Sequence, residues 1–181
     1  MDKKKVLAIC GSTRQTSINH SLIKAIAALS AASLDITIYE KIANLPQFNP
    51  DNDGENVAKE ISDFREQLKN AAGVIICTPE YAHGVPGTLK NAIDWTISSS
   101  SFPNKPTMLI TASTGGHHGH RALLETLKAI EAKHIETLQL VIPFVKTKVS
   151  MDNEITDDKT LVEVERLVAA FIDTLRDKHV D

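Results

Sequence analysis

The 181-residue sequence predicts an α/β fold, an open doubly wound sheet of five parallel strands in the order 2-1-3-4-5 with helices on both faces. Short runs rich in β-branched residues alternate with longer segments whose apolar residues recur at helical spacing. The short runs are nearly continuous in apolar residues, which is typical of strands covered by helices on both faces. Right-handed crossovers then favour this strand order.

The elements follow one another along the chain. The expected strands cover residues 6–10, 36–39, 74–77, 108–112 and 138–142. Apolar stripes predict helices between them and after the last strand, with a further helix that ends at Trp95. The stripes are Ile18, Leu22, Ala25, Ile26 and Leu29; Val57, Ile61, Phe64 and Leu68; Leu123, Leu127 and Ile130; and Leu161, Val164, Val168, Phe171 and Leu175.

Composition limits the class of protein. Hydrophobic residues make up 42% and charged residues 24%, which indicates one globular domain over residues 1–181. A net charge of −3 argues against a nucleic-acid partner. No apolar run approaches the roughly 18 residues that cross a membrane, and the run after the N-terminal lysines is too short for a signal peptide. Cys10 and Cys77 end apolar strands and are expected to be buried and reduced, so we expect a cytoplasmic protein.

Residues 11–19, with the sequence GSTRQTSIN, lie between the first strand and the first helix. A helix N-terminus offers free backbone N–H groups, and burying a phosphate requires several strong donors. The segment adds side-chain donors of three kinds, from Ser12, Thr13, Arg14, Ser17 and Asn19. Ser17 is also placed to cap the helix, so a routine capped turn with a surface arginine fits the same residues. By itself this segment leaves both interpretations open.

Residues 78–87, TPEYAHGVPG, follow the third strand, whose carboxyl end lies beside that of the first in the predicted order. Pro79 ends the strand, so that Glu80 and Tyr81 project at the edge of the sheet. Gly84 and Gly87 permit close approach of a ligand to the backbone. This arrangement suits a flat ring system, although Glu80 alone is more often solvated and Trp95 more often packs a helix end.

The segment after the fourth strand, residues 113–120, reads STGGHHGH. Its glycines indicate a backbone loop that lies along a ligand. Three histidines within four residues raise the question of a metal, but further ligands at suitable spacing are absent from the sequence, so we predict no metal site. Residues 44–56 are expected to form a long loop beside the site, and the serines at 98–101 a connection that only reverses the chain.

Other chemistries lack their motifs. The first loop carries neither a P-loop Gly-Lys-Ser/Thr nor the Gly-x-Gly-x-x-Gly of dinucleotide-binding folds. A Ser-His-Asp hydrolase would need a Gly-x-Ser-x-Gly elbow, which the sequence does not contain. A phosphate site and a flat-ring site at adjacent strand ends instead favour a flavin mononucleotide.

These motifs together resemble the NAD(P)H-dependent FMN reductase family, flavodoxin-like proteins that include azoreductases, quinone reductases and chromate reductases. The resemblance implies that Ser12, Arg14, Ser17 and Asn19 hold the FMN phosphate, with Thr13 beside them. It also implies that the isoalloxazine lies between two sets of residues, which are Pro79, Glu80, Tyr81, His83 and Gly84 on one side and Ser113, Gly115 and Gly116 on the other. His83 stands where the family often has Asn or Ser.

The implied activity is hydride transfer from NADPH or NADH through bound FMN to a quinone, azo, metal-oxyanion or free flavin acceptor, by a ping-pong mechanism. The flavin carries this chemistry, so no catalytic side chain is expected. The family resemblance also implies a homodimer or homotetramer. Two alternatives stay open: a flavodoxin-like one-electron carrier that does not oxidise pyridine nucleotide, and a module that keeps the fold without turnover.

Overall fold

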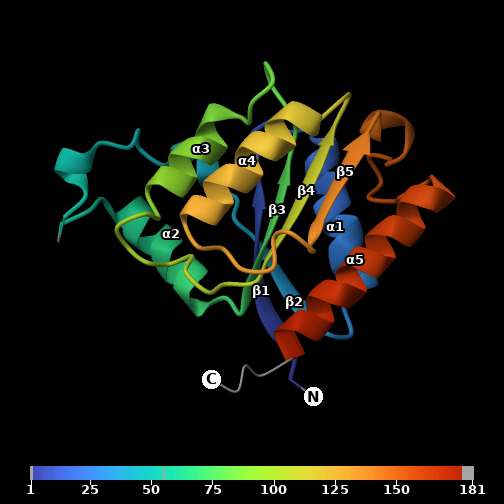
Figure 1. Cartoon of the computed structure of the whole chain (residues 1–181), viewed down its shortest axis with the longest axis horizontal. Helices are drawn as coiled ribbons and strands as arrows, with labels where there is room; N and C mark the ends of the chain where they lie inside the picture. The colour runs from blue at the N-terminus through green and yellow to red at the C-terminus, as the bar shows by residue number, and fades with distance from the viewer. Residues whose placement is uncertain (1, 55, 177–181) are drawn as a thin grey trace.

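Five parallel strands form one sheet in the computed structural model, which describes residues 2–54 and 56–176 (Figure 1). The strand order β2-β1-β3-β4-β5 confirms the predicted topology. The strands are β1 Lys4–Cys10, β2 Leu34–Ile38, β3 Gly73–Thr78, β4 Thr107–Ser113 and β5 Gln139–Pro143. The expected single domain also includes residues 1, 55 and 177–181, which lie outside the described residues.

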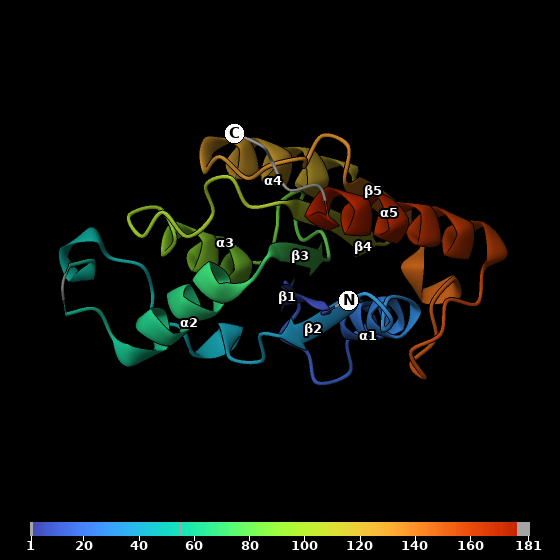
Figure 2. The ribbon, with the colours of Figure 1, turned by 90° about the horizontal axis from the view of Figure 1, so that it is seen from below.

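Five α-helices cover the two faces of the sheet (Figure 2). One face packs against α1 and α5, and the other against α2, α3 and α4. These helices are α1 Ile18–Leu29, α2 Lys59–Asn70, α3 Gly87–Asp94, α4 His117–Ala129 and α5 Asp158–Arg176. Short 3₁₀ turns are η1 Ile42–Asn44, η2 Pro50–Asn52 and η3 Val145–Thr147. Within the described residues, none of the helices is long and apolar enough to cross a membrane.

Burial along the strands agrees with the apolar runs in the sequence. All of β3 is buried, as is β1 from Val6 onward, whereas the edge strand β2 alternates between buried and more exposed residues. Cys10 and Cys77 are register partners at the ends of β1 and β3, and both are buried free thiols. Burial raises the pKa of Cys10 to about 11, and that of Cys77 well above its ordinary value. Both therefore stay protonated at neutral pH, as expected for structural cysteines.

Most residues of the apolar stripes form the helix faces of the core, and those that depart from the prediction, Leu161 among them, lie at or near helix ends. Leu29 is 44% exposed because it ends α1 beyond the residues that contact the core. Val57 precedes α2, and Ile130 follows the last residue of α4. A periodic pattern identifies the face of a helix but does not fix where the helix stops.

The loop after β2 was expected beside the site, and this prediction is wrong. The Pro46 carbonyl accepts hydrogen bonds from Asn91 Nδ2 (3.0 Å) and Trp95 Nε1 (2.8 Å), which hold the loop against α3. Trp95 is buried at the end of that helix, as predicted. The serine run also does more than reverse the chain. Ser98 Oγ donates to Asp53 Oδ2 (2.7 Å), and Arg65 binds the same carboxylate.

Candidate functional site

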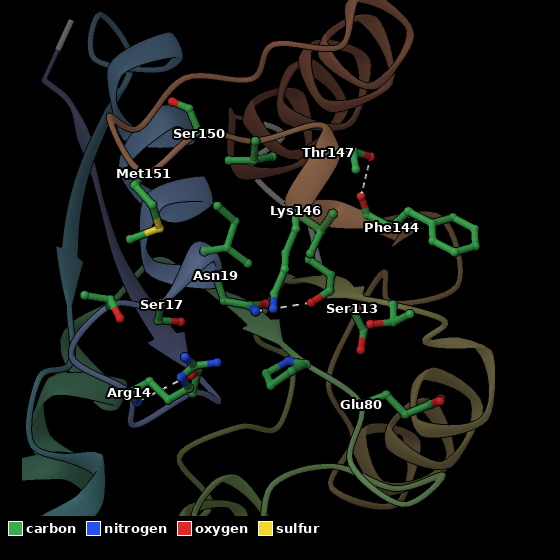
Figure 3. A pocket seen from close by; sticks show the side chains of 18 of the residues that line it. Arg14, Ser17, Asn19, Glu80, Ser113, Phe144, Lys146, Thr147, Ser150 and Met151 are labelled. Carbon is green, nitrogen blue, oxygen red and sulfur yellow. Dashed lines mark hydrogen bonds between the residues drawn. The ribbon is translucent and has the colours of Figure 1, made fainter.

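The carboxyl ends of β1, β3, β4 and β5 open into a cavity of about 900 Å³ (Figure 3). Four segments line it, each at or directly after the end of one of these strands. The lining residues are Ser12, Arg14 and 16–19; 79–81; 112–114; and 144–147 with 149–151. A volume of this size lies within the range of cofactor and small-molecule sites. The cavity is also at the point where the strand order reverses, as expected for an open parallel sheet.

The predicted site residues divide into two groups. Eight line the cavity: Ser12, Arg14, Ser17, Asn19, Pro79, Glu80, Tyr81 and Ser113. Five do not contribute to its lining: Thr13, His83, Gly84, Gly115 and Gly116. All five belong to the same three loops, so the loops are placed as expected, but these five residues are not part of the cavity lining.

Ser17 stands at the N-cap position of α1, but its hydroxyl does not cap the helix. Ser17 Oγ is buried and forms no hydrogen bond of good geometry with any described residue, although it lies close enough to the Cys10 thiol to offset part of the rise in the pKa of that group. A buried hydroxyl without a partner is costly, and the N–H groups of the first helical turn also lack partners within the helix. These donors, together with the positive end of the helix dipole, suit an anion bound in the cavity.

Arg14 and Ser12 lie on the same wall as Ser17. The Arg14 side chain forms no ion pair with any described residue, so its guanidinium is available to a ligand. Ser12 Oγ accepts a weak hydrogen bond from Arg14 N at 3.4 Å. Gly11 lets the loop begin close to β3, because a Cβ at this position would clash with Thr78 Oγ1.

Asn19 connects the first helix to the sheet beneath it. Its Nδ2 donates to the Ala112 carbonyl (3.2 Å), and Cys77 Sγ donates to its Oδ1 (3.3 Å). An amide nitrogen carries two hydrogens, so one N–H of Asn19 remains for the cavity. The side chain therefore serves both to position α1 and to line the site.

Glu80 is partly buried, and its carboxylate is bound by the protein backbone. Its Oε2 accepts a hydrogen bond from Gly119 N at 2.6 Å, in the first turn of α4. This N–H and its neighbours, those of Gly116 and His118, hold the pKa of Glu80 below its ordinary value. Because Gly116 has a φ of 113° and no side chain, Glu80 supplies the cap that α4 lacks in its own sequence.

Two further contacts hold the β3–α3 loop against α4. Tyr81 and Gly84 exchange backbone hydrogen bonds around Ala82 and His83, whose positive φ values of 49° and 61° define a tight I′-type turn. The His83 ring stacks on His118 with centroids 4.2 Å apart. Gly119 permits this approach, since a Cβ there would lie 2.6 Å from the Gly84 carbonyl oxygen.

The three histidines that were predicted in a loop after β4 lie in the first turn of α4, and their surroundings differ. His120 is buried, with Nδ1 at 2.8 Å from Thr111 Oγ1 and Nε2 at 2.8 Å from Gln139 Oε1. Because an amide oxygen only accepts, Nε2 carries the proton, and burial lowers the pKa of His120 so that the ring is neutral. His117 and His118 are exposed. The described residues contain no group of three or more His, Cys, Asp or Glu side chains arranged for a metal.

Sequence reasoning missed the segment after β5, which supplies seven of the lining residues. Val145 and Val149 are buried and anchor it, while Lys146 and Met151 reach the cavity. The strand predicted at 138–142 did offer a signal. Carboxyl ends of parallel strands share one edge of the sheet, so the residues after the fifth strand could have been included in the site.

The donor set fits a mononucleotide with a planar ring. The unpartnered Ser17 hydroxyl, the unpaired Arg14 and the start of α1 suit a terminal phosphate. The backbone turn of 79–81 and the Ser113 segment form the walls farther along the same cavity. FMN requires this combination of a strong anion site and an extended wall.

Comparisons with known proteins agree with this geometry. The family model described as NADPH-dependent FMN reductase matches residues 4–147. The chain is 29% identical to a quinone reductase of Escherichia coli K12 and 28% identical to an NAD(P)H-dependent FMN reductase of Pseudomonas aeruginosa, each alignment covering 94% of both chains. Its fold matches FerB, a flavoenzyme NAD(P)H:(acceptor) oxidoreductase from Paracoccus denitrificans. That match has a TM-score of 0.79 and 25% identity, and it covers 95% of this chain and 97% of FerB. The chain therefore belongs to the NADPH-dependent FMN reductase family and is an oxidoreductase that uses FMN and NAD(P)H.

Proposed function

We propose that the protein transfers a hydride from NADPH or NADH through bound FMN to a quinone, azo, metal-oxyanion or free flavin acceptor by a ping-pong mechanism. The observation that carries the proposal is the buried Ser17 hydroxyl without a partner, at the start of α1 and on the same cavity wall as the unpaired Arg14. The names of the relatives, which include quinone and FMN reductases, support the quinone and flavin acceptors within this range.

The residues have distinct roles in this proposal. Arg14, Ser12 and Ser17 bind the phosphate, with the N–H groups of the first turn of α1 and the remaining N–H of Asn19 close by. The backbone of residues 79–81 and Ser113 border the ring. We place the other predicted residues in the same loops, outside the cavity lining: Thr13, His83, Gly84, Gly115 and Gly116.

When bound, FMN supplies the electron-transfer chemistry, since its ring accepts two electrons from one substrate and gives them to the next. The protein binds and orients the two substrates in turn and needs no nucleophile or catalytic base of its own. In sum, NAD(P)H and a proton from solvent convert a quinone to its hydroquinone and release NAD(P)⁺. Two electrons and two protons reach the quinone, so the reaction balances.

Purified protein tests the proposal directly. We expect it to be yellow, and NADH or NADPH added without oxygen should bleach the visible flavin band. A panel of one quinone, one azo dye, one metal oxyanion and free FMN should then restore the band. Parallel double-reciprocal plots would support the ping-pong order. Protein that binds no FMN would contradict the proposal, and so would bound flavin that neither pyridine nucleotide reduces, which would favour the one-electron carrier.

We also propose that the protein works in the cytoplasm as a homodimer or homotetramer. The two buried free thiols support a reducing compartment. Light scattering coupled to gel filtration measures the mass of the assembly, and a monomer at micromolar concentration would contradict this part of the proposal.

A further inference from the structure

Lys146 lies on the cavity wall that follows β5, within the short helix η3. This wall is well anchored. Val145 and Val149 are 3% and 2% exposed, and Val149 N donates to the Val145 carbonyl at 3.0 Å. Phe144 N donates to the Thr114 carbonyl at 3.2 Å, which ties the segment to the end of β4. Lys146 is therefore presented from a fixed backbone position.

The Lys146 side chain extends into the cavity. Figure 3 shows it directed toward Asn19 on the opposite wall, while the ring of Phe144 points away from the cavity. Lys146 forms no ion pair or side-chain hydrogen bond with any described residue. Its ammonium group is thus free to meet a ligand.

The charged side chains around the cavity differ in whether the protein already binds them. Its lining contains three charged side chains, which are Arg14, Glu80 and Lys146. Glu80 is already bound by backbone N–H groups at the start of α4, with Gly119 N at 2.6 Å. Arg14 lies with Ser12 and Ser17 on the wall that suits the FMN phosphate. Lys146 is the second cation of the cavity without an anionic partner among the described residues.

We propose that Lys146 determines acceptor specificity by binding a carboxylate or sulfonate carried on the ring of an aromatic acceptor, an inference that rests on the proposed function. Lys146 lies between the phosphate-binding wall and the Ser113 wall that borders the flavin ring (Figure 3). An anionic group attached to the reacting ring system of an acceptor comes within reach of this position. A nicotinamide coenzyme instead carries its phosphates on ribose, several bonds from the reacting ring.

The redox step is the one already described. NAD(P)H provides two electrons and one proton, solvent provides the second proton, and an anionic quinone leaves as the hydroquinone with its sulfonate unchanged. Lys146 binds the sulfonate and takes no part in proton transfer. Its effect is therefore expected in acceptor binding rather than in the chemistry of the flavin.

A matched pair of variants tests this role. Lys146→Gln removes the cavity cation, and Lys148→Gln removes the same charge two residues away, outside the cavity lining. The measured quantity is kcat/KM for 1,4-naphthoquinone-2-sulfonate divided by kcat/KM for 1,4-naphthoquinone. Comparing this ratio between variants cancels the different intrinsic reactivity of the two quinones. We expect Lys146→Gln to lower it about fivefold, a modest factor because the side chain is exposed, and Lys148→Gln to leave it at the wild-type value.

A binding measurement provides a second readout that does not depend on turnover. Naphthalene-2-sulfonate and 2-naphthalenemethanol share a ring system but cannot accept electrons from the flavin. Titrated into oxidised holoprotein, the sulfonate should bind about fivefold more weakly to Lys146→Gln than to wild type, and the preference should fade at high salt. Equal sulfonate affinity in both proteins would overturn the proposal.

Two other outcomes would give Lys146 a different role and would also overturn the proposal. A loss confined to kcat/KM for NADPH or NADH would place Lys146 at the coenzyme, since each kcat/KM in a ping-pong reaction reports its own half-reaction. A fall in FMN affinity as large as that of Arg14→Ala would place it at the cofactor phosphate. The proposed function has its own test, which uses wild-type protein alone. It fails if that protein binds no FMN, or if it does not oxidise NAD(P)H in the presence of either quinone.

Discussion

Two walls of the cavity use their polar side chains in opposite ways. On the β1–α1 wall, the buried Ser17 hydroxyl and the Arg14 guanidinium have no partner among the described residues. On the β3–α3 wall, Glu80 is bound by Gly119 N, and His83 stacks on His118. The first wall keeps its donors for a ligand, whereas contacts within the protein hold the second in place.

Because of this difference, mutations on the two walls should change different properties of the protein, cofactor binding on one wall and folding stability on the other. A buried donor without a partner costs free energy until a ligand accepts from it, so mutations on the first wall should change cofactor affinity more than folding. Glu80 contributes a helix cap whether or not a cofactor is bound, so mutations there should change folding first. The following substitutions test that separation.

Arg14→Ala should give the largest effect on binding. Loss of the charge-assisted hydrogen bonds to phosphate should weaken FMN binding by about 1.5–3 kcal/mol. The free energy of unfolding of the cofactor-free protein should stay unchanged, because Arg14 is exposed and lies in a loop. Quenching of FMN fluorescence measures the affinity. Arg166→Ala, an exposed arginine on α5, is the control. Riboflavin lacks the phosphate, so an equal loss of riboflavin affinity would contradict the phosphate role.

Glu80→Gln should instead lower the stability of the cofactor-free protein, by about 1 kcal/mol, because a neutral amide caps α4 less well than a carboxylate. The folded-state pKa of Glu80 lies below its ordinary value of 4.5. Its contribution is therefore present above that value and lost as the pH falls through the folded pKa. Urea unfolding gives the free energy of unfolding of both proteins at neutral pH and at about pH 3. The difference in this free energy between wild type and variant should be smaller at the acid pH.

The exposed Glu66 on α2 offers a matched control for that experiment. Glu66→Gln removes the same charge without removing a cap, so its stability should follow wild type at both pH values. A stability difference for Glu80→Gln that persists undiminished in acid would show that the carboxylate charge is not what holds the loop on α4.

Ser17→Ala should weaken FMN binding by about 1 kcal/mol through loss of one hydrogen bond. The cofactor-free protein should be as stable as wild type or slightly more stable, since a buried hydroxyl without a partner is removed. Ser30→Ala provides the contrast, because Ser30 is also buried but donates to the Ile26 carbonyl at 2.7 Å. That variant should lose stability and keep its FMN affinity. The reverse pattern would show that the Ser17 hydroxyl serves the fold.

Tyr81→Phe should have the smallest effect. The Tyr81 side chain is 51% exposed at the cavity, and its hydroxyl has no hydrogen-bond partner among the described residues. FMN affinity and turnover should change by less than about 0.5 kcal/mol. Tyr81→Ala should cost about 0.5–1.5 kcal/mol of binding, since the ring is lost. Steady-state NADPH oxidation checks both, and inactive Tyr81→Phe with flavin bound would assign the hydroxyl to catalysis.

Local patterns were sufficient for the fold class and for the first wall. Apolar runs without alternation predicted a sheet covered on both faces, and the structure confirms its strand order. The donors of residues 11–19 are contiguous and open a helix, so their place in the cavity follows from short-range geometry. The stripes likewise predicted the helix faces, and they failed only at helix ends such as Leu29.

The tertiary structure alone decided which polar groups remain free for a ligand. Glu80 and its partner Gly119 are 39 residues apart, and Gln139 from β5 occupies the Nε2 side of His120. The loop after β2 lies against α3 because Asn91 and Trp95 bind its Pro46 carbonyl, and Lys146 faces Asn19 because buried valines hold η3 (Figure 3). Periodicity and local propensity describe neighbours along the chain, whereas each of these pairings depends on contacts that form only when distant elements pack together.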